Sequence, residues 1–280
     1  MTSKDTSRAA LGTKHHKEQV IAPLFLKELG ITVEVPANFD SDAFGTFTLE
    51  IPRLGTQKET AVKKARAAMA ALGLNVGIAS EGAFGFHPLV PFGTASIEMV
   101  VFVDDANNLE ICGFHVAAAP YAQSAEVSSL ADALNFAEGI DFPAHGIVLR
   151  PSQKKYQRMV KGIVTRDALK AAANSLLTTH KTIWIETDLR AHMNASRMKN
   201  IELATRDLIE NIKRQCPKCD MPGFRKTGSK PGLPCETCSR PTDLPVADIY
   251  DCDSCGYRRE VALSGSKQTA SAGSCDSCNP

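Results

Sequence analysis

Eight cysteines in the last third of the chain form four Cys-x-x-Cys pairs, a residue type and spacing suited to metal binding. Each pair places two thiolates on one tight turn, here called a knuckle, and two knuckles complete a tetrahedral sulfur site that suits Zn²⁺. Intervals of 15, 13 and 19 residues between the pairs leave room for short β-hairpins. The pattern predicts a zinc-ribbon module with two structural Zn²⁺. The predicted ligands are Cys216, Cys219, Cys235, Cys238, Cys252, Cys255, Cys275 and Cys278.

Disulfides and an iron–sulfur cluster are the alternative interpretations of these cysteines. The chain begins with the polar sequence MTSKDTSRAA and contains no apolar run of membrane-spanning length. We therefore expect a cytoplasmic protein without a membrane partner, in a reducing compartment that favours zinc over disulfides. Cys112, the ninth cysteine, lies in an apolar stretch and is predicted to be a buried strand residue.

The spacing leaves open which knuckles share an ion. Sequential, crossed and nested pairings all use the same eight sulfur atoms. Residues 232–235 and 248–252 both resemble strands that run into a knuckle, which favours sequential pairing. In that arrangement the first knuckle would share an ion with the second, and the third with the fourth.

Length and charge limit the domain organisation and the classes of partner. A chain of 280 residues with 43% hydrophobic content can form one large core and a small appended domain. We predict a disordered segment at 1–8, an α/β domain at 9–210 and the zinc-ribbon domain at 211–280. The formal net charge of +1 excludes a strong global attraction to nucleic acid or acidic membranes. A basic run at 150–166 is expected to be a solvated face, with a phosphate contact as the alternative.

Hydrophobic periodicity predicts alternating strands and helices before residue 210. This alternation predicts the α/β class. Pro23 should kink the first helix or delay its start. The expected strands are 9–13, 31–35, 76–79, 97–103, 109–117, 145–149 and 182–186, and the expected helices are 16–29, 57–72, 124–137, 166–177 and 196–213.

Three segments combine charge with the ends of predicted elements. Residues 13–17 join the first strand to the first helix, where free N–H groups favour an anion that Lys17 would face. Residues 55–66 open a helix, and Thr56 with Glu59 also fits a capping box. Glu81 follows a buried strand, and a buried carboxylate needs a partner. Two carboxylates and two lysines at one sheet edge would suit a Mg²⁺-bound polyphosphate.

These segments, in this order, resemble motifs of the inosine/xanthosine triphosphate pyrophosphatases. The matches are Thr13-Lys-His-His-Lys17, Thr56-Gln-Lys-Glu59-Thr-Ala-Val-Lys-Lys64-Ala and Ala79-Ser-Glu81-Gly, with Thr60 where the family has Asn and Ser80 where it has an acid. The resemblance implies a mixed sheet flanked by helices. It further implies that Thr13, Lys17 and Lys64 bind phosphate, and that Glu59 and Glu81 are catalytic carboxylates that bind Mg²⁺ or activate water. Ala195-Ser-Arg197 is similar to the family element that contacts the nucleotide, which implies a substrate contact for Arg197.

The whole chain is also similar to a bacterial protein family of unknown function. Its members share the Thr-Lys-His-x-Lys-Glu start, a Phe-Gly-Thr-Phe-Thr-x-Glu-Ile segment, Ala-Ser-Glu-Gly-x-Phe-Gly and the knuckles. They also share a polar turn at 186–198 that includes Arg190, His192 and Arg197. Arg190 is predicted to contact substrate, and a helix cap is the alternative role for this turn.

Two functions from different classes follow. The first is a Mg²⁺-dependent protein that binds or hydrolyses a nucleoside triphosphate. The second is a non-enzymatic module that binds nucleic acid or a protein through its zinc ribbons, where Arg225, Lys226 and Lys230 would form a basic patch. In a third interpretation, the zinc module only stabilises the structure.

Overall fold

The computed structural model describes residues 7–46, 50–53, 55–152, 159–263 and 268–280. The chain divides into two compact units, Met1–Ile209 and Glu210–Pro280. Residues 1–6 of the segment predicted to be disordered (1–8) lie outside the described residues, whereas Arg8 is the first residue of a strand. Lys154, Lys155 and Arg158 of the basic run also lie outside the described residues. Among the described residues, no helix combines the length and apolar character needed to cross a bilayer.

A mixed five-stranded sheet forms the centre of the first unit. Its strand order is β2-β1-β3-β4-β5, in which β1 runs parallel to both neighbours and β3, β4 and β5 are antiparallel. With helices on both faces, this sheet confirms the predicted α/β class. The strands are β1 (Arg8–Gly12), β2 (Thr32–Glu34), β3 (Val76–His87), β4 (Val90–Asp104) and β5 (Leu109–Ala118).

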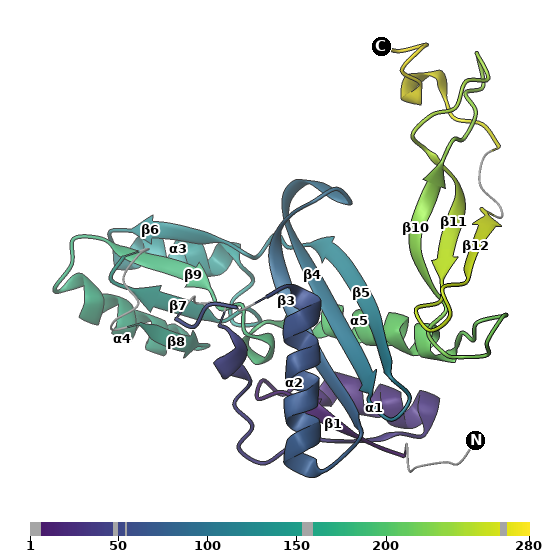
Figure 1. Cartoon of the computed structure of the whole chain (residues 1–280). Helices are drawn as coiled ribbons and strands as arrows, with labels where there is room; N and C mark the ends of the chain where they lie inside the picture. The colour runs from purple at the N-terminus through teal and green to yellow at the C-terminus, as the bar shows by residue number, and fades with distance from the viewer. Residues whose placement is uncertain (1–6, 47–49, 54, 153–158, 264–267) are drawn as a thin grey trace. The chain divides into compact units, whose positions relative to one another are not determined.

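Helices cover both faces of this sheet (Figure 1). The small side chains of α2 (Gln57–Leu72) pack against one face, where Cys112 is buried as predicted. On the other face, Phe25 of α1 (Glu18–Leu29) stacks on Phe102 of β4. The helix α5 (Ala195–Lys213) comes so close to β5 that a Cβ on Gly113 would lie 2.2 Å from the main-chain nitrogen of Leu208. A glycine is therefore required there.

A second sheet of four antiparallel strands completes the first unit, in the order β6-β9-β7-β8. Its core also contains the apolar sides of α3 (Leu130–Gly139) and α4 (Arg166–Leu177). One predicted helix is wrong here, because residues 124–127 form a strand and Ser129 caps the helix by accepting a hydrogen bond from the Asp132 N–H. The strands are β6 (Ser124–Val127), β7 (Ile147–Arg150), β8 (Val160–Ile163) and β9 (Ile183–Thr187).

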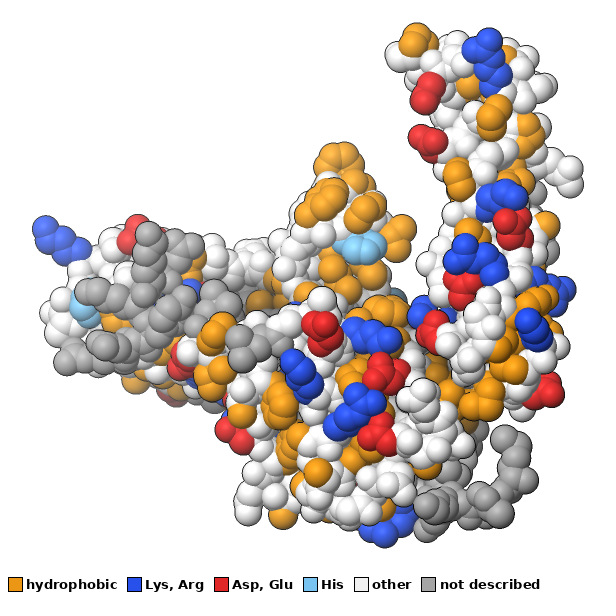
Figure 2. Space-filling model, in the orientation of Figure 1, with side chains coloured by type: hydrophobic (Ala, Val, Ile, Leu, Met, Phe, Trp, Pro, Cys, Tyr) orange, Lys and Arg blue, Asp and Glu red, His pale blue; other side chains and the backbone are white. Residues whose placement is uncertain are grey.

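The hairpin of β3 and β4 is longer than the sequence predicted. We expected a strand at residues 76–79 that ends before Ser80, whereas β3 continues to His87. Glu81 therefore lies in the middle of a strand, paired with Met99 of β4. Hydrophobic side chains gather at the tip of this hairpin (Figure 2), where Phe86, Leu89 and Phe92 are exposed.

The second unit contains an antiparallel sheet of three strands. The strands β10 (Arg225–Pro231), β11 (Pro245–Asp251) and β12 (Arg258–Ala262) follow one another in sequence and in the sheet. Arg225 pairs with Asp251 at one end of the β10–β11 ladder, and Pro231 pairs with Pro245 at the other. The three short 3₁₀ helices of the described chain are η1 (Ser41–Phe44) and η2 (Ala191–Met193) in the first unit, and η3 (Ala272–Ser274) in the second.

Candidate functional site

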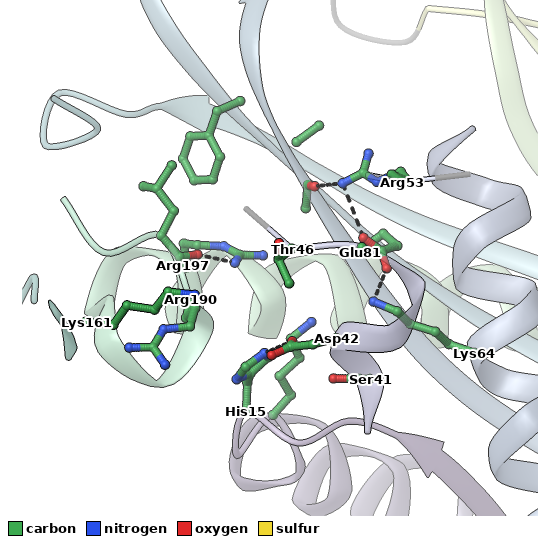
Figure 3. A pocket seen from close by; sticks show the side chains of 16 residues that line it. His15, Ser41, Asp42, Thr46, Arg53, Lys64, Glu81, Lys161, Arg190 and Arg197 are labelled. Atoms are coloured by element: carbon green, nitrogen blue, oxygen red, sulfur yellow. Dashed lines mark hydrogen bonds and ion pairs between the residues drawn. The ribbon is translucent and has the colours of Figure 1, made fainter. Parts of the chain in front are cut away.

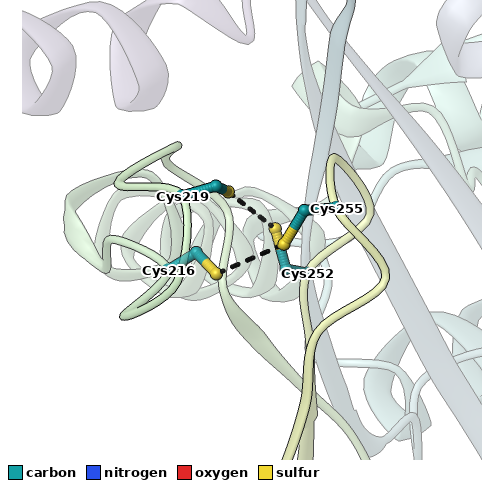
Figure 4. A group of neighbouring side chains, drawn as sticks. All are labelled: Cys216, Cys219, Cys252 and Cys255. Atoms are coloured by element: carbon teal, nitrogen blue, oxygen red, sulfur yellow. Dashed lines mark hydrogen bonds between the residues drawn. The ribbon is translucent and has the colours of Figure 1, made fainter.

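The eight knuckle cysteines gather into two tetrads. In each tetrad, four possible ligand atoms lie within 4.8 Å of one another. Four sulfur atoms about 2.3 Å from a central Zn²⁺ would be about 3.8 Å apart. The measured Sγ–Sγ distances are 3.7 Å in the first tetrad (Figure 4) and 3.9 and 3.6 Å in the second. Both tetrads therefore fit a tetrahedral zinc ion. The first contains Cys216, Cys219, Cys252 and Cys255, and the second contains Cys235, Cys238, Cys275 and Cys278.

The knuckles pair in the crossed arrangement, so the predicted sequential pairing is wrong. The first knuckle shares its site with the third, and the second with the fourth. The reason is the length of β10, which separates the first two knuckles. A seven-residue strand spans roughly 20 Å, so knuckles at its two ends cannot share one ion. The returning strand β11 brings the third knuckle back beside the first.

Main-chain N–H groups favour ionisation of one cysteine in each tetrad. The N–H groups of Cys238 and Thr237 lower the pKa of Cys235 to about 7, and the Thr237 nitrogen lies 3.4 Å from Sγ. Burial opposes ionisation of Cys216, but the N–H groups of Lys218 and Cys219 outweigh it and lower the pKa of this thiol to about 7 as well. Zinc binds the thiolate form, so these turns favour the state that coordinates a metal.

A pocket with several cationic side chains in the first unit could bind a small molecule (Figure 3). Of the described residues, six basic and two acidic side chains line this cavity, which has a volume of about 450 Å³. Glu81, Glu50, Asp188 and Glu98 pair with five of these cations, so the positive charge that favours an anion is that of Lys17. The basic residues are Lys17, Arg53, Lys64, Lys161, Arg190 and Arg197, and the acidic residues are Asp42 and Glu81.

Glu81 lies between two of these cations. Its carboxylate forms an ion pair with Lys64 of α2, and its Oε2 atom lies 3.3 Å from Nη2 of Arg53. Arg53 also donates a hydrogen bond of 2.6 Å to the carbonyl oxygen of Gly82. Lys64 and Glu81 are both buried, so each provides the partner that the other needs away from water. The sequence predicted that Glu81 needed a partner but gave no signal for Arg53, which lies in an irregular loop.

Lys17 is a buried cation held by a neutral group. Its Nζ atom lies 3.2 Å from the carbonyl oxygen of Ser80, and no carboxylate of the described residues forms an ion pair with it. Burial, with Arg197 and Lys64 nearby, lowers the pKa of Lys17 to about 7. This lysine therefore gains or loses its charge near neutral pH, and an anion in the pocket would favour the charged form.

Two arginines of the polar turn reach the pocket while bound to buried carboxylates. Arg197 forms a bidentate ion pair with Glu98 of β4, at 2.7 and 2.9 Å. Gly82 makes room for this pair, because a Cβ there would lie 2.2 Å from Nη2 of Arg197. Arg190 binds Asp188, with Nη2 at 2.6 Å from Oδ2. These carboxylates fix the positions of both guanidinium groups.

His15 and Asp42 form a hydrogen-bonded pair in the wall of the pocket. Nε2 of His15 lies 2.8 Å from Oδ1 of Asp42, and Lys14 also binds this carboxylate. Burial opposes ionisation of Asp42, but its bonds to His15 and Lys14 hold its pKa well below the usual range. Burial also lowers the pKa of His15, and burial together with His15 and Arg190 lowers the pKa of His192 to about 4. Both histidines are therefore neutral near pH 7.

The structure brings together most, but not all, of the predicted pocket residues. Lys17, Lys64, Glu81, Arg190 and Arg197 line the pocket, whereas Thr13 and Glu59 are not among its lining residues. Glu59 completes the capping box of α2, where its Oε2 accepts a hydrogen bond of 2.8 Å from the N–H of Thr56. The hydroxyl of Thr13 accepts a hydrogen bond from the N–H of His15. His15 belongs to the same motif as Lys17, which could have identified it as a pocket residue.

Comparison with known proteins assigns a family but no activity. Neither the curated proteins nor the solved structures include a match to this chain. Residues 64–280, which carry Lys64, Glu81, Arg190, Arg197 and all eight knuckle cysteines, match the family described as Domain of unknown function (DUF6671). This match spans most of the chain, including both cysteine tetrads, and the protein belongs to that family.

Proposed function

We propose that the cationic pocket binds a phosphate-bearing small molecule, and a nucleoside triphosphate in particular. The observation that carries the proposal is the environment of Lys17. Its buried ammonium group lies on the wall of the cavity, and the polar group that it contacts is a neutral carbonyl. Five further basic side chains line the same cavity and could exchange an internal carboxylate for a phosphate oxygen. The volume of about 450 Å³ lies within the range of small-molecule sites. A pyrophosphatase-like fold, expected from the motifs, remains part of this proposal.

The residues of the pocket do not fit the Mg²⁺ ion that the pyrophosphatase resemblance implies. The two carboxylates expected to hold it do not meet, because Glu59 is bound to the N–H of Thr56 outside the pocket lining. Glu81 is paired with Lys64 and Arg53. Mg²⁺ needs several oxygen ligands in near-octahedral geometry. We therefore assign phosphate binding to the basic side chains themselves, without a protein-bound Mg²⁺.

Hydrolysis is a further step of the proposal, and it depends on Glu81. A phosphate group that binds Lys64 and Arg53 would leave the Glu81 carboxylate able to accept a proton from an attacking water molecule. As the water oxygen bonds to phosphorus, the P–O bond to the bridging oxygen breaks, and the departing phosphate or pyrophosphate keeps the bonding electrons. Lys17 would then lie beside the negative charge that develops on the phosphoryl oxygens. Under this proposal, Glu81→Gln keeps phosphate binding and abolishes turnover.

Calorimetric titration of the full chain tests the proposal. We expect binding of a nucleoside triphosphate and of inorganic pyrophosphate, and none of the parent nucleoside. Lys17→Met should weaken binding at pH 6 by about tenfold or more, the effect of losing one charge-assisted hydrogen bond. Lys27→Met is the matched control, since Lys27 lies on α1 with its side chain 78% exposed. Absence of binding at millimolar pyrophosphate, or equal effects of the two substitutions, would overturn the proposal.

The structure offers less support for nucleic-acid binding by the zinc unit. Basic and acidic side chains alternate over its sheet (Figure 2). Arg225 pairs with Asp253, Lys226 with Asp248 and Lys230 with Glu260, at 3.2, 2.6 and 2.8 Å. Cations that are already paired with carboxylates attract a phosphate backbone weakly. We therefore propose a structural role for the two tetrads, each of which fixes one end of the sheet.

A further inference from the structure

A pair of histidines from distant parts of the first unit meets beside the cationic pocket. His15 lies between β1 and α1, and His192 lies in η2. Their Nδ1 atoms are 3.1 Å apart, and the two rings are within 6° of parallel. The ring centroids are 4.9 Å apart, much farther than the nitrogen atoms. The rings therefore meet at their Nδ1 edges rather than face to face.

This geometry is compatible with two imidazoles bound to one metal ion. Imidazole nitrogen binds Zn²⁺ at about 2.0–2.1 Å, so two nitrogens 3.1 Å apart subtend an angle of roughly 100° at the ion. That angle lies between the values for octahedral and tetrahedral coordination. A hydrogen bond between two neutral imidazoles also fits the distance, and the experiment below separates the two interpretations.

Asp42 prepares His15 for metal binding. The Oδ1 atom of Asp42 lies 2.8 Å from Nε2 of His15 and can accept that N–H. When Nε2 carries the proton, Nδ1 of His15 is left with a lone pair directed at the His192 edge. A carboxylate that binds the second nitrogen of a ligating histidine is a regular feature of protein metal sites, because it fixes the ring and raises its basicity.

The remaining coordination positions would be open. Among the described residues, groups of three or more potential metal ligands occur only as the two cysteine tetrads, so the protein supplies two ligands here. His16, the other nearby histidine, meets His192 edge to face, and its Nδ1 contacts Glu18 instead. His15 itself lines the pocket, so a water molecule or a phosphate oxygen can reach an ion bound there. Open positions are typical of reactive rather than structural metal sites.

We propose that His15 and His192 bind one divalent first-row transition ion, such as Zn²⁺ or Co²⁺, at the wall of the cationic pocket. Imidazole ligands select this class over Mg²⁺ and Ca²⁺, which prefer oxygen. The positive charges of Lys17 and Arg190 repel a metal cation bound at the two histidines. The negative charges of Asp42 and of an anionic ligand in the pocket would offset this repulsion. The proposal is separate from nucleotide binding, because the metal content is measured without nucleotide.

Equilibrium dialysis of the full chain against micromolar Co²⁺ tests this site. We expect three ions per chain, two in the tetrads and one at the histidines. The tetrads give intense thiolate-to-Co²⁺ charge-transfer bands, whereas the third ion adds only weak visible absorption. His192→Ala and His15→Ala should each reduce the content to two ions and leave the charge-transfer bands unchanged. His16→Ala is the matched control and should retain three.

Two results would overturn the proposal. The first is that the wild-type protein binds two Co²⁺ ions per chain. In that case the contact between His15 and His192 is a hydrogen bond. The second is a third ion that persists when His15 and His192 are both replaced. Unchanged charge-transfer bands and circular dichroism show that a variant is folded, and His192→Ala decides the outcome if His15→Ala does not fold. Pyrophosphate binding to His192→Ala without added metal tests the pocket proposal independently.

Discussion

The ammonium group of Lys17 lies 3.2 Å from the carbonyl oxygen of Ser80, on a face of the sheet that also carries the buried Arg197–Glu98 pair. A carbonyl can orient an ammonium group but cannot neutralise it. Burial without a carboxylate partner therefore lowers the pKa of Lys17 to about 7. The charge of the pocket should change with pH near neutrality and with the binding of an anion.

The stability of the protein should rise with pH between 7 and 10.5 through Lys17. The pKa of Lys17 is about 7 in the folded state, against an ordinary value of 10.5, so the unfolded chain binds more protons in this window. The difference in unfolding free energy between wild type and Lys17→Met should therefore increase by up to about 1.4 kcal/mol per pH unit. Urea unfolding at several pH values measures it. A pH-independent difference would show that Lys17 is already charged.

Phosphate binding should weaken as pH rises above 7. An anion favours charged Lys17, so binding above pH 7 requires uptake of a proton. The dissociation constant of pyrophosphate should rise by up to about tenfold per pH unit from pH 7 to 9, and Lys17→Met should flatten this dependence. Calorimetry in buffers of different ionisation enthalpy detects the proton directly. If wild type and Lys17→Met have parallel pH profiles, another group is responsible.

Replacement of Glu59 should affect the stability of α2 but not the pocket. Its carboxylate accepts the Thr56 N–H in the capping box. Glu59→Ala should lower the unfolding free energy by about 0.5–2 kcal/mol and leave pyrophosphate affinity unchanged. Thr56→Ala provides the matched comparison, since it removes the other half of the same box. Loss of phosphate binding in Glu59→Ala alone would restore the catalytic role that the motif implied.

A methyl group at Gly82 should disturb the arginine that crosses it. The new Cβ would lie 2.2 Å from Nη2 of Arg197 and within 2.8–2.9 Å of the Glu98 carboxylate. We expect Gly82→Ala to lower the unfolding free energy by about 1–3 kcal/mol, the usual cost of overpacking a buried site. Gly85→Ala, three residues along the same strand, meets no atom within 4 Å and should be nearly neutral. Equal stability of the two variants would contradict this account.

Pairs of cysteine substitutions should report the crossed pairing. Cys219→Ser with Cys255→Ser removes two ligands from one tetrad, so the double variant should retain one zinc per chain. Cys219→Ser with Cys238→Ser damages both tetrads and should retain none. Sequential pairing predicts the reverse result for the two double variants. Zinc content by mass spectrometry after desalting distinguishes them.

The sequence predicted the elements of this protein better than their connections. Residue spacing identified all eight tetrad ligands, and periodicity identified the amphipathic α2 with its buried Ala61 and Ala65. It did not reveal that β3 continues through Glu81, since the mixed polar and small residues at 80–85 resemble a turn. The antiparallel partner β4, which is distant in the sequence, pairs with this segment and keeps it extended.

In the pocket, too, the sequence identified residues that belong to short motifs but not those that only the tertiary fold brings there. Lys17, Lys64 and Glu81 could be found because each belongs to a short motif. Arg53 and Asp42 carry no motif and reach the pocket only through the tertiary fold, whereas Lys161 belongs to the basic run at 150–166, for which a phosphate contact was the alternative prediction. The role of Glu59 was ambiguous for a physical reason, since the same carboxylate suits a helix cap and a metal site.

The crossed pairing of the knuckles also imposes an order on the assembly of the zinc unit during synthesis. The tetrad that ends at Cys255 has all its ligands before residues 256–280 have left the ribosome, whereas the other waits for Cys278. Metal capture at the earlier tetrad would clamp β10 against β11 in register while β12 is still emerging. The edge of β11 would then already be in place when β12 emerges and pairs with it.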